Sequence, residues 1–387
     1  MKKVLLRAPI LSKSGYGEHS RQIFRYLLGK KNIQLSVQTL HWGMTPWTVN
    51  SDDENGLIGE ALKRTVTDDE KGFDVSIQVQ LPNEWDTTYA KYNVGVTAGV
   101  ETDIANPMWS SVHCEKMDKV IVPSEHTRNT LQRSAISKVD IDVVPECYYD
   151  ELTQPCEDLS LDLETDFNFL TVGVLTGQNP YTDRKNLFFL IKWFVEEFKN
   201  NRKVGLIVKT NAGRDTAVDK HGTRNLLKKV LREVGHTEFP KVYLLHGPMD
   251  RKEMTGLYRE KSVKAFVSCT RGEGFGLPFL ESAVAGLPVI ATDWSAHTEF
   301  LNKGKWIKVE NSLEEIHKSK LDNNIFIQGA KWAEVSELDF KKKISTFYKK
   351  PHSPKNWAKD LSNILVETHS FKAISEKYDS VLGDILS

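Results

Sequence analysis

Residues 271–292 read RGEGFGLPFLESAVAGLPVIAT. We expect a strand just before this stretch, a glycine-rich turn within it, and a helix over residues 278–285, where Pro278 suits the first helical turn. A further strand is expected over residues 287–292. A strand, a glycine turn and a helix in this order predict an α/β unit whose turn can approach a ligand closely.

Two carboxylates in this stretch are candidates for ligand binding. The helix start offers free backbone N–H groups and the positive end of its dipole, which suit a diphosphate. Glu273 lies in the turn, and Glu281 lies in the first two helical turns, where a carboxylate can accept both hydroxyls of a ribose. The alternative is an ordinary glycine turn with Glu281 as a solvated helix residue, and glycine spacing by itself does not exclude it.

The rest of the chain repeats the same alternation of short apolar runs and amphipathic segments, which is typical of doubly wound parallel sheets. Strands are expected over residues 4–6, 36–40, 75–80, 92–96, 119–122, 169–174, 204–209, 242–244 and 265–268. Helices are expected over residues 18–28 and 186–198, and over the tail at 357–386. Residues 149–166 are acidic and poor in periodicity, so we interpret them as a linker.

This pattern predicts an α/β protein with two Rossmann-like domains that face a central cleft. The domains are expected at residues 1–150 and 167–350, and residues 351–387 are expected to be helices that cross back to the first domain. The length of 387 residues agrees, because it is too long for one ordinary core. Ligands bind at the carboxyl ends of the strands in such sheets, but the fold does not by itself give the function.

The composition excludes several classes of protein. Lys+Arg and Asp+Glu both count 52, so no strong overall field draws nucleic acid or an anionic membrane. The four cysteines form no CxxC or zinc pattern, which favours buried thiols in a reducing compartment. No apolar run approaches the length of a membrane span, and Arg7 interrupts the first one. We therefore expect a cytoplasmic protein.

The run EGFGLPFLESAVAGLPVIATDWSAHTEFL, residues 273–301, resembles the signature of glycosyltransferase family 4. The resemblance implies the GT-B fold, a retaining and metal-independent transfer, no cofactor, and a nucleotide-sugar as the donor. It also implies that Glu273 contacts the donor sugar and that Glu281 holds the ribose. The backbone of the turn would meet the sugar and the diphosphate, at Gly274, Phe275, Gly276 and Leu277.

The resemblance extends to Asp183-Arg184-Lys185-Asn186, which is similar to the family's R-K-[GN] element. It implies that Lys185 grips the donor phosphates and that Arg184 assists; the alternative is a solvated Arg-Lys pair at a helix start. The family often has Gly-Arg after the preceding strand, whereas this chain has Gly173-Val174 there. Lys209 either replaces the missing arginine or is an ordinary residue at a strand end.

Two segments of the first half also resemble the family. Gly15, Tyr16 and Gly17 occupy the first strand-to-helix turn, where the family has a glycine loop, although an ordinary turn is the more frequent explanation. Glu101, followed by Trp109 and residues 118–124, is similar to the family's "E … W … D-x-[IV]-x-P-S" segment. This similarity implies that Glu101 faces the acceptor or the sugar, and makes Glu101 a catalytic candidate beside Glu273 and Lys185.

Other polar residues are weaker candidates. His113 is expected to be packed or at the surface, and His297 either lines the donor pocket or merely precedes a helix. The acidic clusters at residues 52–54 and 68–70 are expected to be solvated loops, so we expect no metal site.

We therefore predict transfer of a hexose or pentose from a nucleotide-sugar, without a covalent intermediate and with retention at the anomeric carbon. The alternatives are a nucleotide-sugar epimerase or phosphorylase on the same fold, and a non-catalytic nucleotide-sugar binding protein.

The acceptor stays open among saccharide, lipid, protein and DNA. The N-terminal run resembles glycosyltransferases encoded by tailed bacteriophages, which would place the protein in the host cytoplasm and make a hydroxymethylated DNA base a candidate acceptor. Basic clusters at residues 228–232, 341–343 and 349–350 either touch phosphates or are solvated helix faces.

Overall fold

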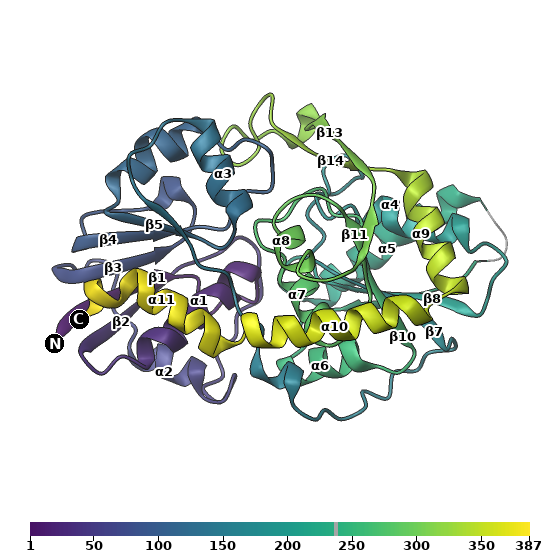
Figure 1. Ribbon diagram of the computed structural model, residues 1–387, viewed down its shortest axis with the longest axis horizontal. Helices are drawn as coiled ribbons and strands as arrows, with labels where there is room; N and C mark the ends of the chain where they lie inside the picture. Colours follow the sequence, from purple (N-terminus) through teal and green to yellow (C-terminus); the bar gives the residue numbers. More distant parts are fainter. Residues whose placement is uncertain (236–238) are drawn as a thin grey trace. The chain divides into compact units, whose positions relative to one another are not determined.

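The computed structural model describes residues 1–235 and 239–387, and the chain divides into two compact units. Unit 1 comprises Met1–Cys147, Asn323–Ile327 and His369–Ser387, and unit 2 comprises Tyr148–Asp322 and Gln328–Thr368. In each unit, helices pack on a parallel sheet (Figure 1). Both units therefore have the α/β organisation that the sequence predicts.

The sheet of unit 1 has the strand order β2-β1-β3-β4-β5-β6, and neighbouring strands are parallel. Its central strands are buried on both faces, which explains why they read as short apolar runs. The strands are β1 (Lys2–Ala8), β2 (Ile33–Thr39), β3 (Phe73–Val79), β4 (Ala90–Val96), β5 (Lys119–Val122) and β6 (Ile141–Val143). The helices are α1 (Gly15–Leu28), α2 (Leu57–Lys63), α3 (Glu125–Ser134) and α11 (Phe371–Leu386).

The sheet of unit 2 has the order β12-β11-β10-β7-β8-β9. The chain winds outward from β7 in one direction and from β10 in the other, so the order reverses between these two neighbours. Its strands are β7 (Phe167–Val172), β8 (Val204–Thr210), β9 (Lys241–His246), β10 (Val263–Ser268), β11 (Val289–Thr292) and β12 (Ile307–Val309). Its helices are α4 (Leu187–Glu197), α5 (Ala217–Val234), α6 (Arg251–Arg259), α7 (Leu277–Val284), α8 (His297–Leu301), α9 (Glu337–Lys349) and α10 (His352–Thr368). The reversal marks the place where ligands bind in such sheets.

Several parts of unit 2 were not expected from the sequence, among them the helices α5, α6 and α9 and the strand β12. An antiparallel hairpin of β13 (Asn311–Glu315) and β14 (Lys331–Val335) precedes α9. Residues 149–166 belong to unit 2 rather than forming a free linker, because Tyr149 and Leu152 are buried in its core. Leu159, Leu161 and Leu163 pack against the same core at alternate positions, and the acidic residues between them hide this pattern in the sequence.

The two C-terminal helices belong to different units. α10 lies in unit 2, where Leu361 and Leu365 are buried against its core. α11 lies in unit 1, where Tyr378 and Leu382 join the core formed with β1 and α1. Lys2 Nζ donates to the carbonyl of Ile385 at 3.0 Å, so both ends of the chain lie together in unit 1 (Figure 1).

The described helices and the cysteines bear on membrane insertion and on disulfide bonding. Among the described residues, no helix is long and apolar enough to cross a membrane. All four cysteines are free thiols, and Cys156 is the exposed one.

The first turn of α1 leaves no room for a side chain at one glycine. A Cβ atom on Gly17 would lie 1.9 Å from the carbonyl oxygen of Ser12, whereas a Cβ atom on Gly15 would meet nothing within 4 Å. We predict that Gly17→Ala lowers the free energy of unfolding by about 1–3 kcal/mol, because the turn must shift to relieve the overlap. Gly15→Ala should be neutral or slightly stabilising, because alanine favours helix. Urea unfolding of both variants checks this, and equal midpoints would contradict it.

Candidate active site

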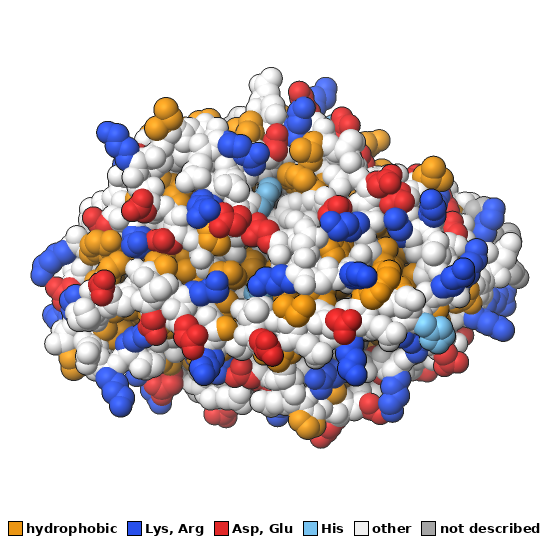
Figure 2. Space-filling view, viewed as in Figure 1, with side chains coloured by type: hydrophobic (Ala, Val, Ile, Leu, Met, Phe, Trp, Pro, Cys, Tyr) orange, Lys and Arg blue, Asp and Glu red, His pale blue; other side chains and the backbone are white. Residues whose placement is uncertain are grey.

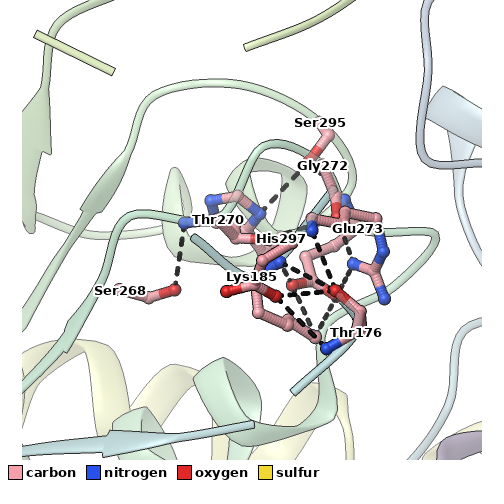
Figure 3. Close-up of polar contacts among 10 residues, drawn as sticks. Thr176, Lys185, Ser268, Thr270, Gly272, Glu273, Ser295 and His297 are labelled. Carbon is pink, nitrogen blue, oxygen red and sulfur yellow. Dashed lines mark hydrogen bonds and ion pairs between the residues drawn. The ribbon is translucent and has the colours of Figure 1, made fainter. Parts of the chain in front are cut away.

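The site lies where the sheet order of unit 2 reverses. Residues 173–186 connect β7 to α4, and residues 269–276 connect β10 to α7. Because β7 and β10 are parallel neighbours, the loops that follow them meet at one edge of the sheet. Figure 3 shows side chains of both loops pointing toward one another.

Glu273 is the centre of this group. Its side chain is buried, and both carboxylate oxygens accept hydrogen bonds from Lys185 Nζ, at 2.6 and 2.8 Å (Figure 3). Arg184 lies 3.3 Å from the same carboxylate, and the Thr270 hydroxyl donates to it at 2.7 Å. The structure therefore brings three of the predicted site residues, Arg184, Lys185 and Glu273, into one contact.

The charges in this group decide the ionisation of the carboxyl. Burial by itself would raise the pKa of Glu273, because it penalises the charged form. The positive charges of Lys185 and Arg184 outweigh that penalty, and the pKa of Glu273 is lowered to about 2. Glu273 is thus an anion near neutral pH, and it is a weak base and a weak nucleophile in this arrangement.

A second arginine ties the two loops together. The Arg271 guanidinium donates to the carbonyl oxygens of Pro180 and Asp183, at 2.7 and 2.8 Å, and it pairs with Glu334 on β14. Arg184 makes the reciprocal contact, donating to the carbonyl of Gly272 at 2.5 Å. The unexpected β13–β14 hairpin therefore supports the site through Glu334.

Short polar contacts present Lys185 toward Glu273. The Thr176 hydroxyl donates to Asp183 at 2.8 Å and accepts from the backbone N–H of Arg184 at 2.8 Å. The other carboxylate oxygen of Asp183 accepts the backbone N–H of Leu187 at 2.7 Å, where α4 begins. A Cβ atom on Gly173 would lie 3.6 Å from the Lys185 side chain, so the stem of this lysine lies against the glycine that follows β7.

Gly276 shapes the start of α7. Its φ of +103° lies in the left-handed region, and a Cβ atom there would lie 3.0 Å from His297 Cβ. Glycine is therefore required where the chain enters the helix. The neighbouring residues Gly274, Phe275 and Leu277 are buried, and the Phe275 ring packs on Phe300 at 5.4 Å between centroids.

His297 packs against the loop that carries Glu273. Its ring is fully buried and stacks on Phe279 at 4.3 Å, and burial lowers its pKa to about 4. Nε2 must carry the proton, because its partner at 2.8 Å is the carbonyl oxygen of Thr292, which only accepts. Nδ1 faces the Ser295 hydroxyl at 3.4 Å, and that hydroxyl accepts the backbone N–H of Glu273 at 2.9 Å (Figure 3). The histidine thus helps to hold Glu273 in place.

Glu281 has a defined partner instead of being an unattached surface carboxylate. It is half-buried on α7, and the Tyr258 hydroxyl of α6 donates to its Oε2 at 2.8 Å. Tyr258 is fully buried, and burial together with the nearby Glu281 charge raises its pKa. The phenol therefore stays protonated and orients the carboxylate.

Lys209 has its contacts elsewhere. It is buried at the end of β8, where its Nζ donates to the carbonyl of Gly247 after β9, and burial lowers its pKa to about 8. Among the described residues, Lys209 contacts neither Lys185 nor Glu273, and its role as a second phosphate clamp stays a prediction.

The predicted residues of the first half lie in unit 1 and form a separate group. The Tyr16 hydroxyl contacts the Thr97 hydroxyl at 2.9 Å and accepts the backbone N–H of Ala98 at 2.9 Å. Gly15, Tyr16 and Gly17, which were expected to form a loop, lie in the first turn of α1, and Tyr16 ties this turn (which we still call the glycine loop) to the segment after β4 that leads to Glu101. Glu101 is half-buried, and its charge contributes to raising the pKa of Tyr16, after the larger effect of burial.

The weaker candidates show ordinary contacts. His113 is half-buried in the helical turn Trp109–His113, and burial lowers its pKa. Asp53 accepts from Thr48, and Glu54 pairs with Arg21 at 2.6 Å. In the described part of the chain, no group of three or more His, Cys, Asp and Glu side chains could hold a metal ion.

Sequence reasoning missed several residues that support the site, namely Thr176, Tyr258, Thr270, Arg271, Ser295 and Glu334. Thr270 and Arg271 directly precede the Gly-Glu-Gly turn, so their position next to it was a usable signal. Tyr258 and Glu334 lie far from the turn in the sequence, and only the packing of α6 and β14 brings them to it.

Residues 181–323 match the family model described as "Glycosyl transferases group 1". A glycosyltransferase from Rickettsia africae has a similar structure, with a TM-score of 0.65, 13% identity, and coverage of 100% of this chain and 99% of that chain. Anabaena HepE, solved with UDP and glucose, has a TM-score of 0.66 at 12% identity, covering 99% of this chain and 100% of its own. Sucrose-phosphate synthase from Thermosynechococcus elongatus has a TM-score of 0.64 at 13% identity, covering 100% and 99%.

No curated protein matches the chain. The structural likeness confirms the predicted GT-B fold of two Rossmann-like α/β domains. The matched domain at residues 181–323 supports a glycosyltransferase, which is the enzyme class predicted from the sequence.

The low pKa of Glu273 predicts how stability changes in acid. A carboxyl with a folded pKa of about 2 and an ordinary value of 4.5 stabilises the fold above about pH 4.5, and this contribution is lost as the pH falls toward 2. Glu273→Gln should therefore be less stable than the wild type at pH 7, by on the order of 3 kcal/mol, with the gap closing below pH 4.5. Urea unfolding of both proteins from pH 7 to pH 3 checks this, and a gap independent of pH would contradict it.

Proposed function

We propose that this chain is a retaining, metal-independent glycosyltransferase that binds a nucleotide-sugar donor on the loops after β7 and β10. One observation carries the proposal: the buried carboxylate of Glu273 is held by Lys185 and Arg184 within the glycine turn that leads into α7. This group combines cations for a diphosphate with an anion for sugar hydroxyls. Glu281, eight positions further along, is the candidate for the ribose.

The donor diphosphate would share the two cations with Glu273. Lys185 and Arg184 together carry two positive charges, and Glu273 carries one negative charge. These three side chains therefore keep a net positive charge beside the helix start at Gly276, which favours an anion. The cations are also held in place before the ligand arrives, so that little reorganisation is needed when charge develops on the leaving group.

The transfer itself needs one bond to break and one to form. The bond between the anomeric carbon and the phosphate oxygen breaks, and its electron pair stays on the diphosphate, which Lys185 and Arg184 stabilise. The acceptor hydroxyl oxygen bonds to the anomeric carbon, and its proton passes to the departing phosphate oxygen. The products are the glycoside and the nucleoside diphosphate.

Two features of the site indicate how a retaining, metal-independent transfer would proceed. Glu273 is clamped by cations and has a low pKa, so it is poorly suited to attack the sugar as a covalent nucleophile. Attack on the face from which the phosphate leaves then accounts for retention. The charge that a divalent cation would neutralise is instead met by Lys185 and Arg184, so we expect activity in the presence of EDTA.

A panel of nucleotide-sugars tests the proposal, with calorimetry for binding, product NMR for the anomeric configuration, and EDTA in a parallel reaction. UDP-sugars come first, because the HepE structure contains UDP and glucose. An epimerase would change the donor without an acceptor, and a binding protein would leave it intact. The absence of a cofactor, the cytoplasmic location and a bacteriophage origin stay predictions.

Glu273→Gln separates donor binding from transfer. We predict that the substitution lowers kcat by about 100-fold or more, because the sugar loses its charged partner. Binding of the free nucleoside diphosphate should be kept or strengthened, since Lys185 and Arg184 lose a competing anion. Steady-state kinetics and calorimetry measure both quantities, and undiminished transfer would remove Glu273 from the mechanism.

Tyr258→Phe tests the assignment of Glu281 to the ribose. Losing the phenol hydroxyl leaves Glu281 without that orienting hydrogen bond, so nucleotide Kd should rise about three- to tenfold. The effect should shrink with a nucleotide that lacks the ribose hydroxyls, because Glu281 then has nothing to grip. The same loss of affinity for both nucleotides would indicate a general structural role for Tyr258.

A further inference from the structure

Unit 1 exposes apolar side chains in the loop between β2 and α2. We call residues 40–50, Leu-His-Trp-Gly-Met-Thr-Pro-Trp-Thr-Val-Asn, the aromatic loop. Met44 is 69% exposed, Val49 is 61% exposed and Trp47 is 37% exposed. Exposed apolar groups this close together mark a binding surface more often than an ordinary one.

Backbone contacts hold the aromatic loop in place, although its apolar side chains are exposed. A bridge pairs Trp47 with Ser12, and the backbone N–H of Lys13 donates to the carbonyl of Pro46 at 2.9 Å. The backbone N–H of Thr48 donates to the carbonyl of Leu11 at 2.8 Å. The apolar side chains are therefore displayed by a backbone that is already ordered, which lowers the entropy cost of binding.

Two aromatic pairs lie in or against this loop. Tyr16 of the glycine loop stacks on Trp42 with ring centroids 4.0 Å apart and an interplanar angle of 28°. His41 lies against Trp47 at 4.7 Å and 36°. Because β1 and β2 are parallel neighbours, the glycine loop and the aromatic loop follow adjacent strand ends, at the sheet edge where ligands bind.

The aromatic loop contains no Lys, Arg, Asp or Glu. A DNA acceptor would require cations for its phosphates, and an anionic lipid headgroup would require them as well. In the basic cluster at residues 341–343, Lys341 pairs with Glu196 and Glu337, and Lys343 lies 3.7 Å from Asp339. On the face drawn in Figure 2, basic and acidic side chains are interspersed, with no extended basic surface.

Polar groups accompany the rings. His41 and Asn50 carry hydrogen-bonding atoms in the same loop, whereas the Thr45 hydroxyl already donates to the carbonyl of Trp42 at 2.9 Å. This combination matches a sugar ring, which has a flat face of C–H groups and an edge of hydroxyls. An aromatic plane covers the C–H face of the sugar, and uncharged polar groups such as the Asn50 amide bind its hydroxyl edge.

We propose that the aromatic loop binds the acceptor, and that the acceptor is an uncharged saccharide whose terminal ring packs on Trp47. The proposal rests on the proposed function for its role in transfer, but the binding itself does not depend on transfer. It selects the saccharide among the acceptors that the sequence left open.

A glycan array probed with the full chain tests the binding directly, followed by transfer assays with the glycans that are bound. Trp47→Ala should weaken saccharide binding and raise the acceptor KM about tenfold, as expected for one stacked aromatic contact. Met44→Gln replaces a more exposed side chain with less risk to the fold, and should weaken saccharide binding a few-fold. Ile136→Gln is the matched control, because Ile136 is 89% exposed in the same unit and lies outside the loop; it should change neither quantity.

The outcomes distinguish this proposal from the proposed function. Saccharide binding that Trp47→Ala removes, with donor Kd unchanged, supports the aromatic loop even if no transfer is detected. The proposal is overturned if no glycan is bound, if saccharide binding is unaffected by both loop variants, or if transfer to hydroxymethylated DNA is preferred. Binding to phosphatidylcholine vesicles that Met44→Gln abolishes, without saccharide binding, would also overturn it in favour of a lipid.

Discussion

The ion pair between Glu273 and Lys185 is the interaction on which the site depends. A buried carboxylate is tolerated only because Lys185, Arg184 and Thr270 supply charge and hydrogen bonds. The same contacts join the loop after β7 to the loop after β10. The ion pair therefore holds both loops in position and also places their charges. A ligand that enters with negative phosphates meets cations that are already ordered.

The sequence predicted the parts of this site that local pattern controls. The glycine turn, the helix start at Pro278 and the Arg184-Lys185 pair could be recognised because each is a short contiguous motif, and the family resemblance assigned them to one ligand. The sequence did not predict the supporting contacts of Tyr258 and Glu334, because these contacts depend on how α6 and β14 pack. Residues 149–166 were misread as a linker because acidic residues mask the alternating leucines that bury against unit 2.

The two units differ in the chemistry they offer. Unit 2 holds the charged group around Glu273, which suits a diphosphate and a polar sugar. Unit 1 offers the uncharged aromatic loop, together with the glycine loop that Tyr16 ties to the strand end after β4. The amino group of Lys209 contacts the carbonyl of Gly247, outside the contacts around Glu273, and its role toward the donor phosphates stays a prediction.

The most direct test of the account is a crystal structure with the nucleoside diphosphate of the best donor bound. We expect the diphosphate at the start of α7, with Lys185 Nζ in hydrogen-bond contact with a phosphate oxygen and the ribose against Glu281. A diphosphate bound elsewhere, with Lys185 Nζ still on Glu273 and in contact with no phosphate oxygen, would contradict this.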